Sequence, residues 1–186
     1  MDRGEPVRSA VADDATALSA LATRVFRETY GVALPEAILA PYLARTFSPA
    51  AFQLMIADPE EMVWVAIVDG QLSGYAKLVI APLPSDRHRS AAVELHTLYI
   101  DRQHRGSGLG KALLGQALAW AHSQEYAIMW LCVWQKNDEA RTFYARLGFV
   151  IVGTTAVPVD GVVFHDWVMA RPTTATDTVS PSPVLR

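Results

Sequence analysis

The most informative segment of the chain reads Leu98-Tyr99-Ile100-Asp101-Arg102-Gln103-His104-Arg105-Gly106-Ser107-Gly108-Leu109-Gly110-Lys111-Ala112-Leu113-Leu114. Its apolar start predicts a β-strand, its glycines predict a turn, and its apolar end predicts an amphipathic helix. Glycine permits positive φ angles and lets another group approach the backbone closely. The free N–H groups of such a turn and of the helix start form an anion site, and Arg105 and Lys111 add positive charge at its mouth.

Two common nucleotide-binding patterns do not fit this segment. The phosphate loop of many ATP-binding proteins ends in Gly-Lys-Ser/Thr after a spacer of about four residues, whereas Ala112 follows Lys111 here. The dinucleotide pattern G-x-G-x-x-G requires a third glycine one position later than Gly110. The segment follows instead the pattern Q-x-x-G-x-G, from Gln103 to Gly108. A nucleotide-binding protein and a glycine-rich connection without a ligand are alternatives at this point.

The rest of the chain predicts helices first, and then strands that alternate with helices. Apolar residues recur at helical spacing from Asp13 or Asp14 to Gly31, after Pro35, and from Ser48 onward. This order predicts an α+β fold, an α/β sandwich with a mixed sheet and helices on both faces. Further helices are expected at residues 108–122 and 137–148, and strands at residues 7–9, 62–68, 72–80, 92–100, 127–134, 149–159 and 162–170.

Length and charge favour one folded domain without a nucleic-acid partner. The chain has 186 residues and a formal net charge of −3, and its pI is about 5.9. A general nucleic-acid-binding protein usually has a basic surface and a higher pI, so these values argue against such a function. We expect one domain at residues 1–170, and a disordered tail at residues 171–186, which are rich in Pro, Thr and Ser.

Cysteine usage and apolar runs narrow the class further. Cys132 is the only cysteine, which excludes an internal disulfide and a multi-cysteine zinc site. The pair His165-Asp166 is too short for a metal site, and no metal is expected. The longest apolar run, residues 126–134, is shorter than the roughly 20 residues of a membrane span. The polar N-terminus lacks the apolar core of a signal peptide, so we expect a cytoplasmic protein with no membrane partner. Three further histidines are expected to be exposed: His88, His104 and His122.

Segment 98–114 is similar to the acetyl-CoA motif of the GNAT superfamily of N-acetyltransferases, Q/R-x-x-G-x-G/A. A second block resembles the family's N-x-x-A-x-x-F/L-Y-x-K/R-x-G-F and reads Asn137-Asp138-Glu139-Ala140-Arg141-Thr142-Phe143-Tyr144-Ala145-Arg146-Leu147-Gly148-Phe149. The resemblance covers residues 7–170. It implies a central, mostly antiparallel sheet with a parallel central strand pair, and acetyl-CoA as the acyl donor.

The resemblance also implies which residues hold acetyl-CoA. Backbone groups of Leu98 and Ile100 would bind the pantetheine arm like one more strand. Asn137 would contact the cofactor arm, and Tyr144 would lie near the thioester sulfur. The pyrophosphate would be held by the backbone N–H groups of Arg105, Gly106, Ser107, Gly108, Leu109 and Gly110. Three neighbours complete the expected cofactor site: Tyr99, Gln103 and Lys111.

Acetyl transfer to an amine requires a neutral amine, a stabilised carbonyl oxygen and a proton for the leaving thiolate. Tyr144 is the expected proton donor, because a phenol is protonated at neutral pH. Helical spacing puts it on one face with Asn137 and Arg141. From the residues alone, packing in the core beside Phe143 and Phe149 is the alternative role of Tyr144, and the motif match favours catalysis.

Glu94 and His96 are the candidates for the catalytic base. In a regular strand their side chains point to the same side as Leu98 and Ile100, and a bulge would reverse this. The two side chains would then lie about 7 Å apart and share a water chain to the incoming amine. Direct attack with proton loss to water is the alternative.

The acceptor is less defined by the sequence than the donor. Residues 15–30, Phe47-Ser48-Pro49 and Glu94-Leu95 resemble bacterial polyamine acetyltransferases of the spermidine/spermine type, whereas Thr97 stands where that group tends to have a basic residue. The first two helices, the loop at residues 82–90 and the last hairpin should form the acceptor site. Acids and aromatic rings there would suit a cationic amine: Glu28, Glu36, Asp86, Asp160, Tyr30 and Trp64.

These features predict an acyl-CoA-dependent N-acetyltransferase that acts on the primary amine of a small molecule, with a polyamine as one candidate. Acetylation of a protein N-terminus or lysine and a non-catalytic acyl-CoA-binding sensor are the alternatives. Tight binding of ATP or NAD in place of acetyl-CoA would favour a nucleotide-binding protein. Members of the superfamily often pair, and symmetric dimers are common, which favours a homodimer.

Overall fold

The computed structural model describes residues 7–84 and 91–174. Residues 85–90 of the expected acceptor loop and residues 175–186 of the expected tail lie outside the described residues. Within the two described ranges, no helix has the length and apolarity of a membrane span. The elements are β1 (Val7–Ser9), α1 (Ala15–Tyr30), α2 (Glu36–Thr46), α3 (Pro49–Ala57), β2 (Glu61–Val68), β3 (Gln71–Val79), β4 (Ala92–Ile100), α4 (Leu109–Ser123), β5 (Ile128–Trp134), α5 (Asp138–Arg146), β6 (Val150–Val159) and β7 (Val162–Pro172).

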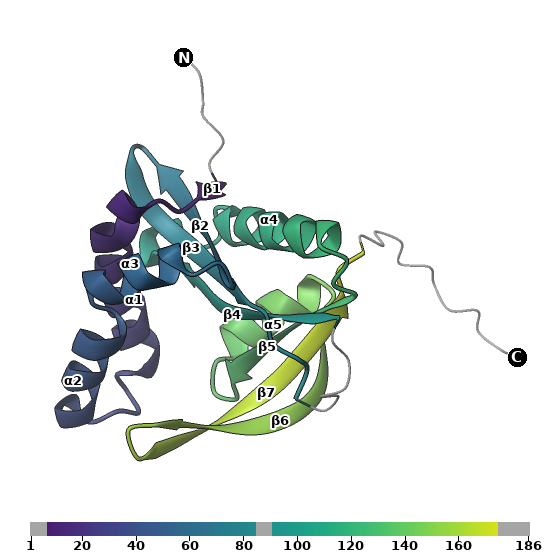
Figure 1. Cartoon of the computed structure of the whole chain (residues 1–186). Helices are drawn as coiled ribbons and strands as arrows, with labels where there is room; N and C mark the ends of the chain where they lie inside the picture. The colour runs from purple at the N-terminus through teal and green to yellow at the C-terminus, as the bar shows by residue number, and fades with distance from the viewer. Residues whose placement is uncertain (1–6, 85–90, 175–186) are drawn as a thin grey trace, which may run out of the picture.

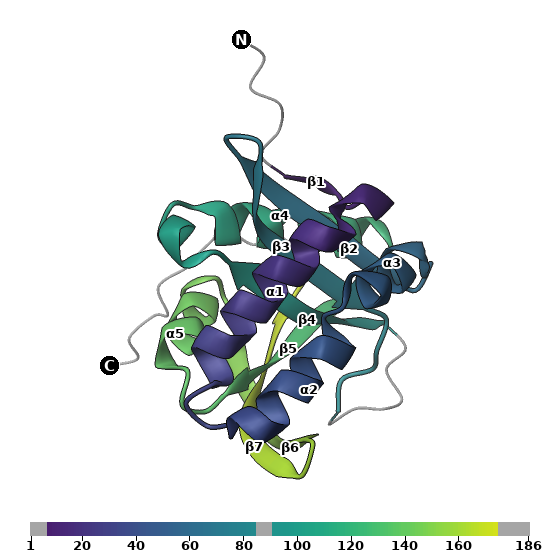
Figure 2. The ribbon, with the colours of Figure 1, turned by 90° about the vertical axis from the view of Figure 1, so that its left-hand side faces the viewer.

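A seven-stranded sheet runs through the molecule in the order β1-β2-β3-β4-β5-β7-β6. Among the described strands, β4 and β5 form the only parallel pair, and α4 connects them. Helices α1, α2 and α3 cover one face of the sheet, and α4 and α5 lie on the other (Figure 1 and Figure 2). The predicted α+β sandwich with a parallel central pair is therefore confirmed.

The parallel strands β4 and β5 stay together over a short distance. Ladder pairs join residues 92–94 of β4 to residues 128–130 of β5. Beyond them the described strands share no further pair, so residues 96–100 leave a strand edge open toward β5. A β-bulge at His96 marks the point of separation, because the register of β4 against β3 shifts there by one residue. The strands therefore diverge at the centre of the sheet.

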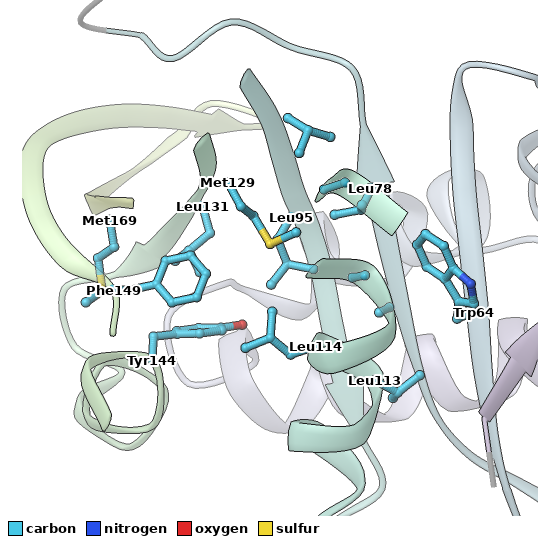
Figure 3. Packing of buried hydrophobic residues seen from close by; sticks show 14 of the residues in the cluster. Trp64, Leu78, Leu95, Leu113, Leu114, Met129, Leu131, Tyr144, Phe149 and Met169 are labelled. Carbon is cyan, nitrogen blue, oxygen red and sulfur yellow. The ribbon is translucent and has the colours of Figure 1, made fainter. Parts of the chain in front are cut away.

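Apolar side chains fill both faces of the sheet. On the α4 face, Leu113 and Leu114 pack with Met129 of β5 (Figure 3). On the opposite face, Leu18 and Leu21 of α1 pack against β2 and β3. Full burial of one such side chain stabilises the fold by roughly 1.5–3 kcal/mol relative to exposure. These two layers hold β4 and β5 in place on either side of their separation.

The first helix begins where the sequence predicts it, but its cap differs. Helix α1 starts at Ala15, directly after Asp14. The carboxylate of Asp14 accepts hydrogen bonds from Arg8 (2.7 Å) and from the N–H of Val11 (2.8 Å), and it does not cap the helix. A short 3-10 turn precedes α1, and the carboxylate of Asp14 hydrogen-bonds the residue before this turn instead of the start of the helix.

The folded domain continues beyond residue 170, after which the sequence predicts a disordered tail. Strand β7 continues to Pro172, and the following Thr173 is buried. The hydroxyl of Thr173 donates to the carbonyl oxygen of Tyr126, and Arg171 donates to that of Leu147. Polar composition suggested disorder, whereas the backbone of these residues pairs with β5. Ladder and side-chain hydrogen bonds extend the folded domain past residue 170.

Candidate active site

A cleft of about 740 Å³ lies where β4 and β5 separate. Its walls come from the C-terminal end of α1, the second half of β4, the glycine turn with the start of α4, the end of β5, and α5. The described lining includes most residues expected to hold acetyl-CoA: Leu98, Tyr99, Ile100, Arg105, Gly106, Gly108, Gly110, Lys111, Asn137 and Tyr144. The expected residues that do not belong to that lining are Gln103, Ser107 and Leu109, and, of the candidate bases, Glu94.

The turn between β4 and α4 presents backbone N–H groups to the cleft. Gly106 and Gly108 have φ angles of 78° and 94°, and Gly108 is the N-cap of α4. In the described part of the chain, no atom lies within 4 Å of a Cβ built at either glycine. The N–H groups of Arg105 and Ser107 donate to carbonyl oxygens inside the turn, over 3.4 and 3.3 Å. Of the six N–H groups expected to hold the pyrophosphate, four are therefore free to bind an anion: those of Gly106, Gly108, Leu109 and Gly110.

Positive charge and an open cradle make this turn fit a pyrophosphate. The N-terminal end of the α4 dipole points there, and Lys111 lies in the first turn of the helix. The guanidinium of Arg105 also lines the cleft and lies 3.4 Å from the carboxylate of Glu28 on α1. A second ion pair joins Arg24 of α1 to Asp101. Helix α1 is therefore tied to the turn at two points.

Tyr144 reaches the cleft from α5. Asn137 caps this helix, because its Oδ1 accepts from the N–H of Ala140 at 3.1 Å. The Tyr144 ring packs against Phe143 and Phe149 with centroids 5.2 and 5.6 Å away, and its hydroxyl points from α5 toward α4 (Figure 3). Burial raises the pKa of the Tyr144 hydroxyl above its usual value, so the group is protonated at neutral pH. Tyr144 thus packs in the core and also lines the cleft.

A glycine permits the close approach of α4 to α5. A Cβ at Gly110 would lie 3.2 Å from the ring of Phe143, which is tighter than ordinary contact. The contact places the first turn of α4, where Lys111 lies, beside the helix that carries Tyr144. The turn and the tyrosine are thereby held against one another.

The expected common orientation of Glu94, His96, Leu98 and Ile100 is wrong. Leu95 and Leu98 both pack into the α4-face core, because the bulge at His96 takes up one residue between them. Glu94 therefore faces the α1 side, opposite to Leu98. The Nδ1 of His96 still lies 3.3 Å from the Oε1 of Glu94, and His96 lines the cleft. The pair thus stands at the point where the strands separate.

Aromatic side chains form the end of the cleft on the α1 side. Tyr30 packs against Trp134 and Phe164 at centroid distances of 5.6 and 5.5 Å, and the latter two rings lie 5.4 Å apart. Burial raises the pKa of the Tyr30 hydroxyl, and nearby Asp166 adds to this effect. Cys132 lines the cleft beside them, and burial raises the pKa of its thiol to about 12, with Glu94 and Asp166 contributing. The thiol is therefore protonated at neutral pH and is a poor nucleophile.

Most of the acids expected at the acceptor site have other partners. Among the expected aromatics, Tyr30 lines the cleft, whereas Trp64 packs against Trp120 under α4. Asp86 lies outside the described residues. The sequence offered these acids as candidates but did not predict the arginines that pair with them. The ion pairs, at 3.4, 2.5 and 3.0 Å, join Glu28 to Arg105, Glu36 to Arg27, and Asp160 to Arg45.

The burial of two residues, Asp166 and His104, was not predicted from the sequence. Asp166 is 8% exposed, lies opposite Trp134 in the β5–β7 ladder, and has an Oδ1 without a hydrogen-bond partner among the described residues. His104, expected to be exposed, is half-buried and lines the cleft. An acid inside the apolar run of the last strand was the available signal for Asp166. Across the described ranges, no three His, Cys, Asp or Glu residues are grouped as metal ligands.

Comparisons with known proteins indicate one family for this chain. The model of the acetyltransferase (GNAT) family matches residues 25–149. An uncharacterised N-acetyltransferase of Mycobacterium tuberculosis (strain H37Rv) is 34% identical over 158 residues, which cover 85% of this chain and 97% of that protein. The N-alpha-acetyltransferase RimI of the same strain is 32% identical over 106 residues, covering 56% of this chain and 62% of that protein.

A solved structure shares the fold. The PaiA N-acetyltransferase of Thermoplasma acidophilum, in complex with coenzyme A, superposes with a TM-score of 0.75. The two sequences are 20% identical, and the match covers 89% of this chain and 97% of the other. The fold of this chain is therefore one already seen in a solved structure.

Proposed function

Because the chain belongs to the GNAT family of acetyltransferases, we propose that it transfers an acetyl group from acetyl-CoA to the primary amine of a small molecule by direct attack. The observation that carries the proposal is one continuous cleft that joins the glycine turn, Tyr144 and the aromatic end at Tyr30. Its volume of about 740 Å³ lies in the range of small-molecule sites, roughly 300–1,000 Å³.

The chain's own groups suit the donor. Acetyl-CoA supplies an acetyl group activated as a thioester. The free N–H groups of Gly106 and Gly108, together with Lys111, would hold the pyrophosphate. The open edge of β4, residues 96–100, would pair with the pantetheine arm as a further strand does. Asn137 would contact the same arm from the start of α5.

The acid–base groups for the reaction would come from α5 and β4. One N–C bond forms and one C–S bond breaks, while one proton leaves the amine and one reaches the sulfur. Tyr144, whose hydroxyl is protonated at neutral pH, would donate the proton to the sulfur. Glu94 and His96, 3.3 Å apart where the strands separate, would take the amine proton through His96. Proton transfer of this kind contributes a factor of about 10² to 10⁴ to the rate.

A polyamine is the finer candidate for the acceptor. The sequence resemblance to spermidine/spermine-type enzymes supports it, and the aromatic end with Tyr30, Trp134 and Phe164 would stabilise a cation. A second candidate is a protein N-terminus, which the similarity to RimI supports. The two candidates differ in size, since a peptide needs an open groove beyond the cleft.

Thiol release from acetyl-CoA, measured with a panel of amines, tests the proposal. The panel contains diamines, polyamines, amino acids, aminoglycosides and short peptides with free N-termini. Turnover with small amines and little with peptides is the expected result. Preference for peptides would favour the second candidate. If acetyl-CoA raised the melting temperature but no amine or peptide were acetylated, the proposal of amine acetylation would be wrong.

A further inference from the structure

Asp166 lies on the acceptor side of the sheet. It faces Trp134 across the β5–β7 ladder, and Cys132 lies two residues before Trp134 on the same face of β5. Tyr30 packs over Trp134 from α1. Cys132, Trp134 and Tyr30 all line the cleft. Asp166 is not itself a lining residue, so its carboxylate lies behind the wall that Cys132 and Trp134 form.

Within residues 7–84 and 91–174, Asp166 takes part in no ion pair. Asp166 is 8% exposed, and among the described residues no group hydrogen-bonds its Oδ1. Its neighbour His165 is exposed and alternates to the other face of β7, while Tyr30 and Cys132 are neutral groups. Burial raises the pKa of Asp166, and His165 opposes this only in part. An acid in such a place is costly and is seldom kept without a partner.

The surroundings of Asp166 suit an ammonium group. Three aromatic rings, of Tyr30, Trp134 and Phe164, lie within 5.4–5.6 Å of one another. The ammonium of Lys136 already lies 5.8 Å from the centre of the Trp134 ring, within the range of a cation–π contact. A carboxylate behind aromatic faces is a common way to hold an alkylammonium ion.

The reacting nitrogen itself does not suit this position. It must be neutral when it attacks, and a carboxylate beside it would raise its pKa and keep it protonated. The Glu94–His96 pair lies where β4 and β5 separate, whereas Asp166 lies on the far side of β5 from β4. The site therefore offers one end for a reacting amine and another end for a permanent charge.

From this arrangement we infer that the buried charge of Asp166 holds a second, non-reacting ammonium group of the acceptor at the aromatic end, so that the cleft selects linear diamines and longer polyamines over monoamines. The inference rests on the proposed function, acetylation of a small amine, and it assigns the group that sets the specificity. Asp166 acts on binding of the acceptor and takes no part in proton transfer.

A paired-substrate experiment tests the inference. Initial rates are measured with 1,4-diaminobutane and with butylamine, at saturating acetyl-CoA, for the wild type, Asp166→Asn and Asp160→Asn. Asp160 lies on the same hairpin but is paired with Arg45 away from the cleft, so it controls for loss of one negative charge. We expect the wild type to prefer the diamine by at least about 10-fold in kcat/KM. Asp166→Asn should lower kcat/KM about 10- to 100-fold for the diamine and less than about 3-fold for butylamine.

Binding without turnover gives an independent readout. Tetramethyl-1,4-diaminobutane is a dication that cannot be acetylated, and its effect on the melting temperature reports the subsite alone. We expect stabilisation of the wild type and of Asp160→Asn, and none of Asp166→Asn. Equal stabilisation of all three proteins, equal rate losses for both amines, or no preference in the wild type would overturn the inference. If no amine is acetylated but the dication still stabilises only proteins with Asp166, the subsite stands and the proposed reaction fails.

Discussion

The two halves of the cleft, which we propose to hold acetyl-CoA (the donor half) and the amine (the acceptor half), differ in the groups that line them. The donor half comes mainly from one contiguous segment, residues 96–111, with Asn137 added from the start of α5, and it offers backbone N–H groups and an open strand edge. The acceptor half comes from α1 and β5 and offers side chains such as Tyr30 and Trp134, and Asp166 of β7 lies behind them. A backbone site depends on φ angles and space, whereas a side-chain site depends on which residues the fold brings together.

Because the two halves use different groups, specificity for the acceptor can change independently of specificity for the donor. The backbone cradle for acetyl-CoA constrains glycines and leaves most side chains in the segment free to vary. The acceptor half lies on the opposite side of the separated strands, so its side chains can change without altering the cradle. The fold can therefore keep one donor while the acceptor changes, which matches the general division between scaffold and site.

The largest expected effect comes from Gly108→Ala in the donor half. Gly108 has a φ of 94°, and its Cβ would project into the open cradle. Loss of two charge-assisted hydrogen bonds to the pyrophosphate corresponds to a Kd for acetyl-CoA about 1,000-fold higher. Isothermal titration with acetyl-CoA measures this change.

Gly161→Ala is the matched control for this variant. Gly161 has a φ of 90° at the tip of the β6–β7 hairpin and also has open space around its Cβ within the described chain. Both substitutions should cost about 1–2 kcal/mol of stability, because alanine is strained in this region. Equal acetyl-CoA affinity in the two variants would contradict a backbone-built donor half.

The next effect concerns Tyr144, which stands between the halves. Tyr144→Phe keeps the ring packing with Phe143 and Phe149 and removes the proton donor. We expect kcat to fall about 100-fold, while the rise in melting temperature caused by acetyl-CoA stays within error. Tyr126→Phe is the control, because Tyr126 stacks on Trp120 outside the cleft. Activity of Tyr144→Phe equal to that of this control would remove Tyr144 from the chemistry.

The same contrast explains what the sequence could predict. The donor half was recognisable because one segment carries Gly106, Gly108 and Gly110 in order between a strand and a helix, and the fold class followed from the element order. The placement of Glu94 was not recognisable, because the bulge at His96 follows from packing against β3. Asp166 was missed as well, since its importance depends on Trp134 and Tyr30, which are distant in sequence.

A smaller effect concerns stability in the acceptor half. Burial raises the pKa of Asp166, so folding favours its protonated form. Ionising the buried carboxylate lowers the free energy of unfolding. This cost is absent below the pKa of about 3.9 that aspartate has in the unfolded chain, and it is complete once the pH has risen through the higher pKa of the folded state. Asp166→Asn should therefore gain about 1 kcal/mol of stability at pH 7, and the gain should vanish as pH falls toward 4. Urea unfolding from pH 4 to pH 7 measures it.

The control for this stability change is Asp160→Asn. Asp160 is exposed and paired with Arg45, so its loss should leave stability at pH 7 within about 0.5 kcal/mol or lower it. A gain that is the same in both variants would reflect net charge and would count against a buried, uncompensated carboxylate at position 166.

The smallest expected effect tests whether the two halves are independent. Glu28 of α1 holds the Arg105 guanidinium at 3.4 Å, at the border between the aromatic end and the glycine turn. Glu28→Gln would release Arg105 toward the pyrophosphate, and exposed ion pairs are worth at most about 1 kcal/mol, so acetyl-CoA should bind about 2- to 3-fold more tightly. Glu36→Gln, which breaks the exposed pair with Arg27 away from the cleft, is the control and should leave this Kd unchanged. If Glu28→Gln weakened acetyl-CoA binding instead, the ion pair would be holding Arg105 in its binding position, and α1 would belong to the donor half as much as to the acceptor half.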